Sequence, residues 1–322
     1  MRNITYMQAL QEAHIEEMKR DESIFLMGIE LRNMGSGIGQ TMGAYQEFGP
    51  DRIFDTPISE SGYVGTAVGL ALGGIRTIVE VQFADFLSYA FDSIVNQAAK
   101  IRYLSAGKEC VPLVIRAPQG MGFFFGAQHS QCVEGWFLNV PGLKIAIPSN
   151  AYDAKGLLKS AIRDDDPVLF LEHKECIFMK GEVPEEEYTV PFGQAKIVRP
   201  GADVTIVAMQ KMVWESLKAA EELEKEGVSV EIIDPRTLVP FDKDTVFESV
   251  KKTGKVVIAN EAPKRGSVSG EISALITENC FNYLKAPIMR VGAENIPIPF
   301  GVNETHVLPN ANDIMAAVKS II

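Results

Sequence analysis

The most informative stretch of the sequence is Asp55-Thr-Pro-Ile-Ser-Glu-Ser-Gly-Tyr-Val-Gly65. A turn with a proline delivers one acidic side chain, Glu60, to the start of a predicted helix. Glycines then recur every fourth residue, at Gly65, Gly69 and Gly73, and residues with this spacing lie on one helix face. Because each glycine costs a helix up to about 1 kcal/mol relative to alanine, this face indicates a very close neighbour. The neighbour is a partner helix, a cofactor or the chain's own sheet.

Strands and helices are expected to alternate on both sides of this stretch, because short apolar runs predict strands and amphipathic runs predict helices. A helix opens the chain, since Thr5 and Gln8 have capping-box spacing. The first half predicts strands at 23–29, 77–83, 111–116, 143–147 and 167–171, and helices near 61–74, 89–105, 131–139 and 150–163. The second half predicts strands at 202–208, 228–233, 255–259 and 288–291, and a helix over 212–226 that Gly227 ends. This alternation predicts an α/β fold with two parallel-sheet domains.

The boundary between the two domains is predicted from composition. Two prolines and an acidic cluster interrupt the alternation between Lys180 and Pro191, as is typical of an interdomain linker. We therefore expect a first domain over residues 1–185 and a second over residues 186–322. Residues 32–55 are rich in glycine and poor in periodic apolar positions, which predicts a long functional loop.

Bulk composition excludes several classes of protein. The formal net charge of −11 argues against nucleic acid or an anionic membrane as the main partner. No apolar run is long enough to span a bilayer, and the first residues lack the pattern of a signal peptide. The four cysteines are scattered, which indicates neither a disulfide framework nor a zinc site. We expect reduced thiols in a cytoplasmic protein.

Polar and aromatic residues follow the predicted strand that begins at Thr77. The stretch reads Glu80-Val-Gln-Phe-Ala-Asp-Phe86, and Gln82 and Phe86 interrupt its apolar pattern where the strand passes into a helix. Open α/β sheets bind ligands at the carboxyl ends of their strands. Gln82 and Phe86 are therefore candidates for a binding site, with ordinary core packing as the alternative for Phe86.

A second unusual stretch reads Gly120-Met-Gly-Phe-Phe-Phe-Gly-Ala-Gln-His-Ser-Gln131. Its consecutive aromatics, flanked by glycines, are unlike a buried strand. His129 lies in its polar part, and histidine is the side chain best suited to proton transfer near neutral pH. A structural, hydrogen-bonded histidine is the alternative. His14, on a charged amphipathic helix, is expected to be solvated. The sequence contains no phosphate-binding loop and no dinucleotide-binding glycine motif after a strand.

Together these motifs resemble the beta subunit of the thiamine-diphosphate-dependent first component of 2-oxo acid dehydrogenase complexes. The resemblance covers essentially the whole chain, and its anchors are residues 55–62, 80–86, 127–131, 141–144, 153–158 and 234–238. It implies a pyrimidine-binding domain, a smaller transketolase-like C-terminal domain, and an α2β2 heterotetramer with an alpha subunit.

The resemblance also implies roles for single residues. Glu60 matches the glutamate that hydrogen-bonds the thiamine pyrimidine, so that a ring nitrogen can remove the thiazolium proton. Phe86 matches the aromatic that stacks on the pyrimidine, and Gln82 and Ile58 match residues that line the cofactor. His129 matches the active-site histidine associated with acyl transfer to the lipoyl group of the second component.

Metal ions are implied by the resemblance as well. Ala161, Asp164 and Asp166, with the carbonyl of Leu113, match a potassium site of some family members, although acidic loop residues are usually only solvated. The family's Gly-Asp-Gly motif, which holds magnesium and the diphosphate, does not occur in this sequence. The resemblance therefore implies that the alpha subunit holds magnesium with its carboxylate and carbonyl oxygens.

Three functions stay open at this point. The first is an acyl-generating subunit, for which the loop around Phe125 and the linker favour acetoin over pyruvate and branched-chain 2-oxo acids. The stretch 295–303 departs from acetoin-type chains. The second is a self-sufficient transketolase-like enzyme, which would need a diphosphate-binding domain. The third is an assembly module that docks the second component through residues 318–322.

Overall fold

The computed structural model describes all 322 residues, which form two compact units. The first unit contains Met1–Gln119 and Trp136–Phe192, and the second contains Gly120–Gly135 and Gly193–Ile322. The chain therefore passes between the units after residues 119, 135 and 192. None of the helices combines the length and hydropathy that crossing a bilayer requires.

The first unit is built around a parallel sheet with the strand order β6-β7-β5-β4-β2-β3. These strands are β2 (Phe25–Gly28), β3 (Ile53–Asp55), β4 (Thr77–Glu80), β5 (Leu113–Gln119), β6 (Lys144–Ala146) and β7 (Val168–His173). Strand β1 (Arg2–Thr5) pairs antiparallel with β8 (Lys180–Val183) in a separate ribbon. Because β2, β3 and β4 run parallel, their carboxyl ends lie side by side at the same end of the sheet.

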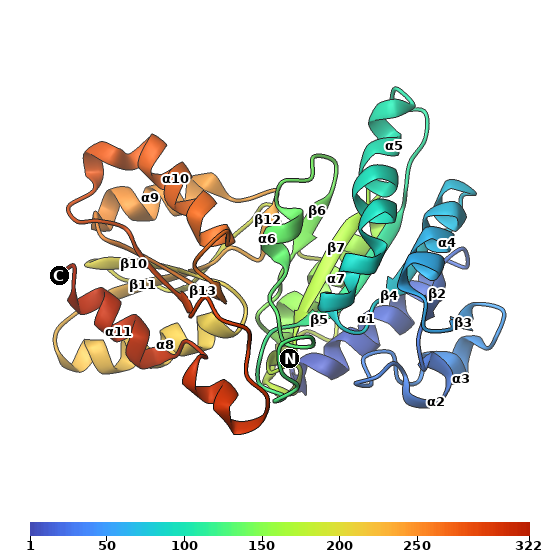
Figure 1. Cartoon of the computed structure of the whole chain (residues 1–322), viewed down its shortest axis with the longest axis horizontal. Helices are drawn as coiled ribbons and strands as arrows, with labels where there is room; N and C mark the ends of the chain where they lie inside the picture. Colours follow the sequence, from blue (N-terminus) through green and yellow to red (C-terminus); the bar gives the residue numbers. More distant parts are fainter. The chain divides into compact units, whose positions relative to one another are not determined.

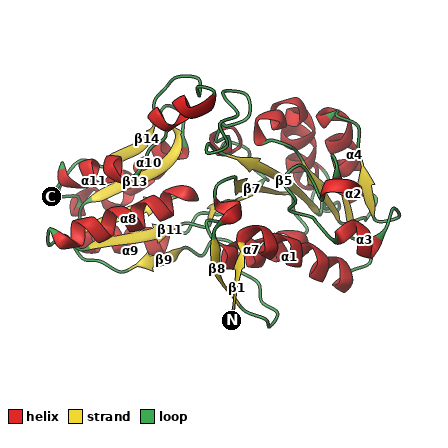
Figure 2. Cartoon of the chain, turned by 90° about the horizontal axis from the view of Figure 1, so that it is seen from below, coloured by secondary structure: helices red, strands yellow, loops and turns green.

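Helices lie on both faces of this sheet (Figure 2). Their bounds are α1 (Tyr6–Arg20), α2 (Leu31–Met34), α3 (Ala44–Phe48), α4 (Glu60–Leu72), η1 (Ala84–Ala90), η2 (Ser93–Ala98), α5 (Ala99–Leu104), α7 (Ala151–Arg163) and η3 (Cys176–Phe178). The short α6 (Glu134–Phe137) lies where the chain passes from the second unit back to the first. Helix α4 buries Val64, Ala67, Val68 and Ala71 and leaves its glycines outside.

The second unit is a smaller three-layered α/β fold (Figure 1). Its sheet has the order β14-β13-β10-β11-β9, parallel except for the edge strand β9. The elements are β9 (Lys196–Arg199), β10 (Val204–Ala208), α8 (Lys211–Lys225), β11 (Val230–Asp234), β12 (Thr237–Val239), α9 (Lys243–Thr253), β13 (Val256–Pro263), α10 (Val268–Cys280), η4 (Phe281–Tyr283), β14 (Met289–Ala293), η5 (Gly301–His306) and α11 (Ala311–Lys319). Helices α8 and α11 cover one face and α9 and α10 the other.

The predicted α/β class with two largely parallel sheets is confirmed. The capping box is also confirmed, because the Thr5 hydroxyl accepts the Gln8 N–H and the Gln8 side chain accepts the Thr5 N–H. The helix predicted near 89–105 is confirmed, since residues 84–104 are continuously helical and include a π-helical turn at η2. The helix predicted over 131–139 is wrong in extent, because only the single turn α6 is helical there.

Two further predictions need correction. The first four residues of the predicted linker form β8, because their backbone pairs with β1 at the other end of the unit. His14 is fully buried instead of solvated, and its Nδ1 lies 2.7 Å from the Leu10 carbonyl oxygen. Burial, together with the charge of Arg116, lowers the pKa of His14, so its ring stays neutral at pH 7.

Candidate functional site in the first unit

The candidate site lies where β2, β3 and β4 end. Glu60 is the first residue of α4, and backbone hydrogen bonds fix the turn that leads to it. The Asp55 carboxylate accepts the N–H groups of Leu31 and Arg32 at 2.6 and 3.1 Å, and the Thr56 N–H donates to the Gly28 carbonyl at 2.8 Å. The loop after β2 and the turn after β3 are thereby joined, which holds Glu60 at the ligand-binding edge.

Glu60 is 9 % exposed, and its carboxylate oxygens keep contact with solvent but make no hydrogen bond or ion pair within the chain. A carboxylate that no side chain binds is available to a ligand that donates a hydrogen bond. Tyr63 lies one turn later with its hydroxyl buried and unpartnered. Burial, followed by the charges of Glu60 and Glu80, raises the pKa of Tyr63 and keeps its hydroxyl protonated.

Gln82 follows β4, and its amide is oriented by a buried charge network. Its Nε2 donates to Glu80 Oε1 at 2.6 Å. Arg116 pairs with Glu80 at 3.1 Å and with Glu172 at 2.6 Å, and all three of these side chains are fully buried. Because each member of the network is held by the next, the side-chain orientation of Gln82 depends on residues from three strands.

The loop after β2 completes this network. Gln40 donates to Glu172 Oε2 at 3.1 Å and accepts from the Ser36 hydroxyl at 2.5 Å. A Cβ added at Gly37 would lie 2.1 Å from Gln82 Oε1, so a larger residue here would displace the Gln82 amide. The predicted functional loop thus contacts a predicted site residue.

Phe86 and Ile58 lie at the same strand edge. Phe86, on η1, is half-buried, and its ring stacks on Tyr89 with a centroid distance of 6.2 Å and an interplanar angle of 23°. Part of the Phe86 ring is therefore accessible, and both ligand binding and core packing remain open for it. Ile58 is 81 % exposed in the turn before Glu60.

The glycine face of α4 does not pack against the chain's own sheet. Gly69 and Gly73 are exposed, and a Cβ added at Gly69 would meet no atom within 4 Å. A Cβ at Gly65 would lie 3.4 Å from Ser93 Oγ of η2. Several large apolar side chains of the same unit are also exposed, namely Leu72, Tyr89, Phe91, Tyr103 and Leu104. The chain's own sheet is therefore not the close neighbour of this glycine face. A partner helix and a cofactor remain as the two explanations.

The residues matched to a potassium site do not fit that ion well. Lys144 Nζ binds both Asp164 carboxylate oxygens, at 2.8 and 2.7 Å, and Asp166 at 3.2 Å. Arg76 Nη1 donates a hydrogen bond to the Asp164 carbonyl oxygen at 2.5 Å, and the Ala161 carbonyl oxygen accepts the Asp164 N–H at 3.3 Å. The acidic residues are thus ion-paired rather than merely solvated, and side-chain cations already match their charge. Leu113 is the first residue of β5, next to β4.

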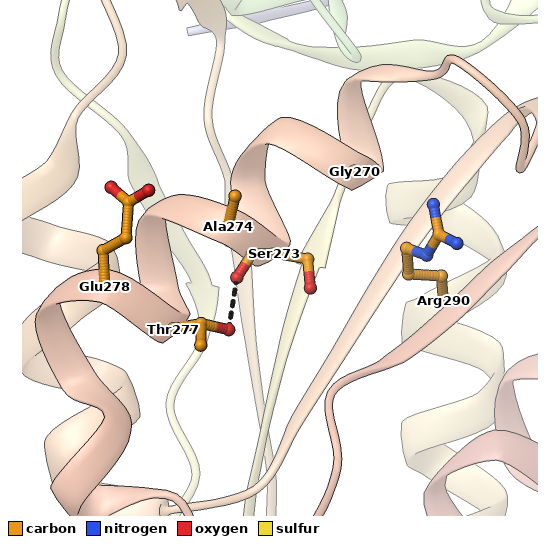
Figure 3. Close-up of a pocket in the computed structure, with 6 residues that line it drawn as sticks. All are labelled: Gly270, Ser273, Ala274, Thr277, Glu278 and Arg290. Carbon is orange, nitrogen blue, oxygen red and sulfur yellow. Dashed lines mark hydrogen bonds between the residues drawn. The ribbon is translucent and has the colours of Figure 1, made fainter.

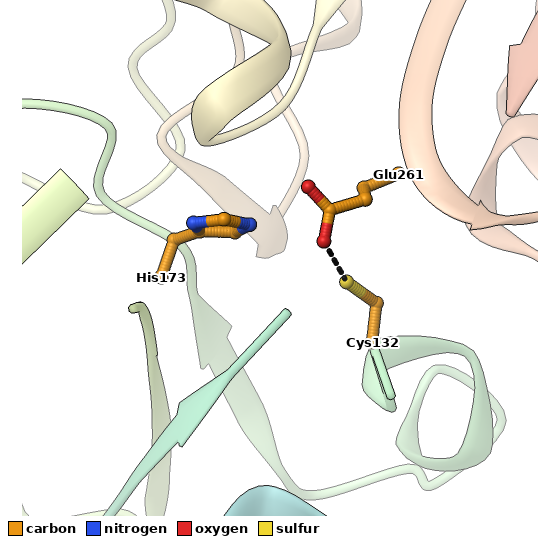
Figure 4. Close-up of side chains that lie close together, drawn as sticks. All are labelled: Cys132, His173 and Glu261. Carbon is orange, nitrogen blue, oxygen red and sulfur yellow. Dashed lines mark hydrogen bonds between the residues drawn. The ribbon is translucent and has the colours of Figure 1, made fainter. Parts of the chain in front are cut away.

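His129 belongs to the second unit, where it is half-buried with its ring edge-on to Phe125. The acidic side chain that binds its loop is not among the residues singled out from the sequence. Glu261 Oε1 accepts the Met121 N–H at 2.6 Å and lies 3.7 Å from Cys132 Sγ (Figure 4). The signal for Glu261 was its place near the carboxyl end of the predicted strand 255–259, where polar residues follow an apolar run.

A separate cavity of about 480 Å³ lies on the outside of the second unit, between α10 and β14 (Figure 3). Its lining combines Ser273, Thr277 and Glu278 of the helix with Arg290 of the strand. The Thr277 hydroxyl donates to the Ser273 carbonyl at 2.8 Å. None of the residues singled out from the sequence lines this cavity.

Comparisons with known proteins agree with the two-unit architecture. The family described as the pyrimidine binding domain of transketolase matches residues 2–178, and the transketolase C-terminal domain matches residues 193–314. A solved structure titled "Split gene transketolase, inactive beta4 tetramer" superposes with a TM-score of 0.79 at 25 % identity, covering 99 % of this chain and 98 % of that chain.

Curated relatives match over nearly their full length. The beta subunit of acetoin:2,6-dichlorophenolindophenol oxidoreductase from Cupriavidus necator is 46 % identical, over 99 % of this chain and 97 % of its own. The 2-oxoisovalerate dehydrogenase subunit beta of Bacillus subtilis is 43 % identical over 99 % and 98 %. The pyruvate dehydrogenase E1 component subunit beta of the same organism is 42 % identical over 100 % and 99 %.

Proposed function

Because the chain belongs to the family of E1 beta subunits of thiamine-diphosphate-dependent oxo acid dehydrogenases, we propose that it contributes half of such an active site. With an alpha subunit it would cleave a C–C bond next to a carbonyl and transfer the acyl fragment to a lipoyl group on the second component. The observation that carries this proposal is the nearly buried Glu60 carboxylate, which has no partner within the chain.

Glu60 would bind the pyrimidine ring of thiamine diphosphate. When bound, the cofactor supplies a carbon nucleophile and an electron sink for cleavage of the C–C bond. The carboxylate of Glu60 would share a proton with a ring nitrogen, which satisfies a buried group that otherwise lacks a hydrogen bond. Phe86 would offer its half-exposed ring for stacking, while Gln82 and Ile58 would line the pocket. His129 would serve the transfer of the acyl group to lipoyl.

Acetoin is the substrate we favour, with pyruvate next and branched-chain 2-oxo acids third. The support is the sequence of the loop around Phe125 and the 46 % identity to an acetoin-oxidising relative. The identities of 42 and 43 % to the pyruvate and 2-oxoisovalerate relatives are close behind, so the alternatives are tested in parallel.

The alpha subunit would complete the site in an α2β2 heterotetramer. We assign magnesium and the diphosphate to it, because this sequence lacks the motif that holds them. The open glycine face of α4 and the exposed apolar side chains beside it are the surface we propose for subunit contact. We place the complex in the cytoplasm, since none of the four cysteines forms a disulfide. The lipoyl-bearing component would dock through residues 318–322.

The deciding experiment uses this chain co-purified with its alpha subunit, thiamine diphosphate and magnesium. Acetoin, pyruvate and 2-oxoisovalerate are offered with an artificial electron acceptor. Glu60→Gln is expected to reduce turnover by about a thousandfold, because general acid–base assistance of this kind contributes about 10²–10⁴-fold. Glu271→Gln, which changes an exposed acid in the first turn of α10, is the matched control and should keep full turnover.

Other outcomes would change the assignment. Full turnover by Glu60→Gln contradicts the proposed role of the carboxylate. Turnover by the purified beta chain alone would favour a self-sufficient transketolase-like enzyme. Loss of second-component binding after deletion of residues 318–322, with artificial-acceptor turnover intact, would separate docking from catalysis.

A further inference from the structure

The segment 120–135, which carries His129, is folded against the second unit. We call it the His129 loop. It closes on itself, because the Gly120 N–H donates to the Gln131 carbonyl at 3.1 Å and the His129 N–H donates to the Gly126 carbonyl at 3.2 Å. Phe124 has a φ of 61°, a conformation that a bulky residue keeps only when its surroundings hold it there.

One buried carboxylate contacts both ends of the His129 loop. Glu261 lies in β13 with 4 % of its surface exposed. Its Oε1 accepts the Met121 N–H at 2.6 Å near the start of the loop and lies 3.7 Å from Cys132 Sγ near the end. Hydrogen bonds from backbone N–H groups to a carboxylate are among the stronger ones in proteins, so this contact restrains both ends at once.

A second carboxylate holds the next residue of the loop. Glu304, on η5, is 1 % exposed, and its Oε1 accepts the Gly122 N–H. Its Oε2 is buried without a partner, a cost that a purely structural position would be expected to avoid. The segment before η5 also contacts the loop: the Gly301 N–H donates to the Phe124 carbonyl at 3.2 Å, and Phe125 forms a β-bridge with Phe300.

A lysine lies near these carboxylates. Burial lowers the pKa of Lys211, and the nearby carboxylates of Glu261, Glu215 and Glu304 act in the opposite direction. The unit therefore places two carboxylates against the backbone of the loop that contains the candidate histidine, and each accepts a hydrogen bond from an N–H group of that loop.

We propose that Glu261 and Glu304 are positioning residues for His129, which hold the loop by its N–H groups so that the imidazole meets the acyl acceptor. The inference rests on the proposed function of His129. Neither side chain takes part in bond making. Their effect falls on the step that uses His129, while C–C cleavage at the Glu60 site does not depend on them.

The test uses the enzyme assembled with its alpha subunit and compares two electron acceptors. Dichlorophenolindophenol reports the steps up to C–C cleavage, and a lipoyl domain also reports acyl transfer. Glu261→Ala and Glu304→Ala are expected to lower lipoyl-linked turnover about ten- to a hundredfold, in line with the cost of a misplaced catalytic group. Dye-linked turnover should stay near the wild-type rate. Glu261→Gln keeps an acceptor oxygen and should restore most of the lipoyl-linked turnover.

Glu215→Ala is the matched control, because Glu215 is also buried, accepts the Ala311 N–H at 3.1 Å and acts on Lys211, but does not bind the loop. Amide hydrogen exchange of residues 120–135 should rise in Glu261→Ala and stay unchanged in the control. If Glu261→Ala does not assemble with the alpha subunit, Glu261→Asp is used instead, because its shorter side chain moves the carboxylate away from the loop by one methylene. The same exchange and turnover measurements are then compared with those of Glu215→Ala.

Two results overturn the proposal in distinguishable ways. Unchanged exchange of the His129 loop in Glu261→Ala, or equal loss of both electron-acceptor activities, shows that Glu261 does not position the loop. His129→Ala is measured in parallel. If it keeps lipoyl-linked turnover while loop exchange still rises in Glu261→Ala, the loop is anchored but the proposed function of His129 is wrong.

Discussion

At the scale of single residues, the first unit contains glycines that differ in how much room surrounds them. Gly142 has a φ of 96°, and an added Cβ would lie 1.9 Å from the Ala99 carbonyl oxygen. Gly74 has a similar φ of 86°, but an added Cβ would meet no atom within 4 Å. The pair separates the effect of backbone conformation from the effect of a steric clash.

Gly142→Ala is expected to lower the free energy of unfolding by about 3 kcal/mol or more, because a backbone carbonyl cannot move aside without moving α5. Gly74→Ala should cost about 1 kcal/mol, the price of a positive φ alone. Urea denaturation of the two variants measures both values. Equal losses would mean that the turn at Gly142 relaxes freely.

Asp242 gives a residue-scale prediction about pH. Burial acts to raise its pKa, but the N–H groups of Thr245 and Ala195 and the Thr245 hydroxyl bind the carboxylate and lower its pKa overall. A carboxyl with a lowered folded pKa adds stability above its unfolded pKa of about 3.9 and loses it as pH falls through the folded value.

Asp242→Asn keeps the N-cap of α9 but removes the charge. We therefore expect the difference in stability between the wild type and this variant to be largest near pH 6 and to shrink towards pH 3. Thermal unfolding across this range measures it. A difference that stays constant with pH would show that the amide's geometry, and not the charge, causes the loss.

At the scale of elements, α1 and α7 meet through a row of opposite charges. Lys155 Nζ binds Glu12 at 2.8 Å and Glu16 at 2.6 Å, and Lys159 Nζ binds Glu16 at 2.8 Å. Both lysines are at most 2 % exposed on their side chains. The two helices are therefore joined by ion pairs whose lysines are buried, while the side chains of Glu12 and Glu16 stay 27 % and 38 % exposed. Salt should screen these pairs less than fully exposed ones.

Lys155→Met is expected to cost about 1–2 kcal/mol, because it removes a buried cation that Glu12 and Glu16 share. The loss is limited because Arg2 still pairs with Glu12 and Lys159 with Glu16. Lys225→Met, which removes an exposed pair with Glu222, should change stability by less than about 1 kcal/mol. Denaturation at low and high salt tests both. Similar losses in the two variants would mean that the α1–α7 charges are more hydrated than their burial indicates.

Much of the element pattern could be predicted because it depends on local sequence. The Thr5–Gln8 capping box and the strands of both sheets follow from spacings of a few residues. The pairing of β1 with β8 joins residues 2–5 to 180–183, and no local pattern encodes it. Burial of Lys155 and Lys159 was likewise hidden, since their positions read as an ordinary charged helix face until Glu12 and Glu16 are placed opposite.

In the candidate site, too, some residues could be predicted from local sequence and others depend on contacts between distant segments. Glu60 was predicted from its place after a proline turn at the start of a helix, and Gln82 and Phe86 because they interrupt an apolar pattern at a strand end. The roles of Glu261 and Glu304 depend on contacts with residues 140 and 182 positions away in sequence. A stretch that reads as part of the first half, residues 120–135, is assigned to the second unit by contacts of this kind.

At the scale of the whole molecule, the second unit is not a contiguous piece of chain. Residues 193–322 expressed alone would leave Glu261 and Glu304 without the N–H groups of Met121 and Gly122. An unpaired buried acceptor costs about 1–3 kcal/mol, and more for a charged group. We expect this fragment to be less stable in urea than the same fragment with residues 120–135 joined to it by a flexible linker. Equal stabilities would contradict the contribution of the His129 loop.

The three crossings of the chain also bear on recombination between relatives. A chimera joined at residue 192 would take the His129 loop from one parent and Glu261, Glu304 and Phe300 from the other. Parents that differ at these positions would yield mismatched hybrids even though the junction falls between two compact units. Exchanging residues 120–135 together with residues 193–322 keeps the His129 loop and the residues that bind it from the same parent. The two stretches should therefore be exchanged together in any chimera.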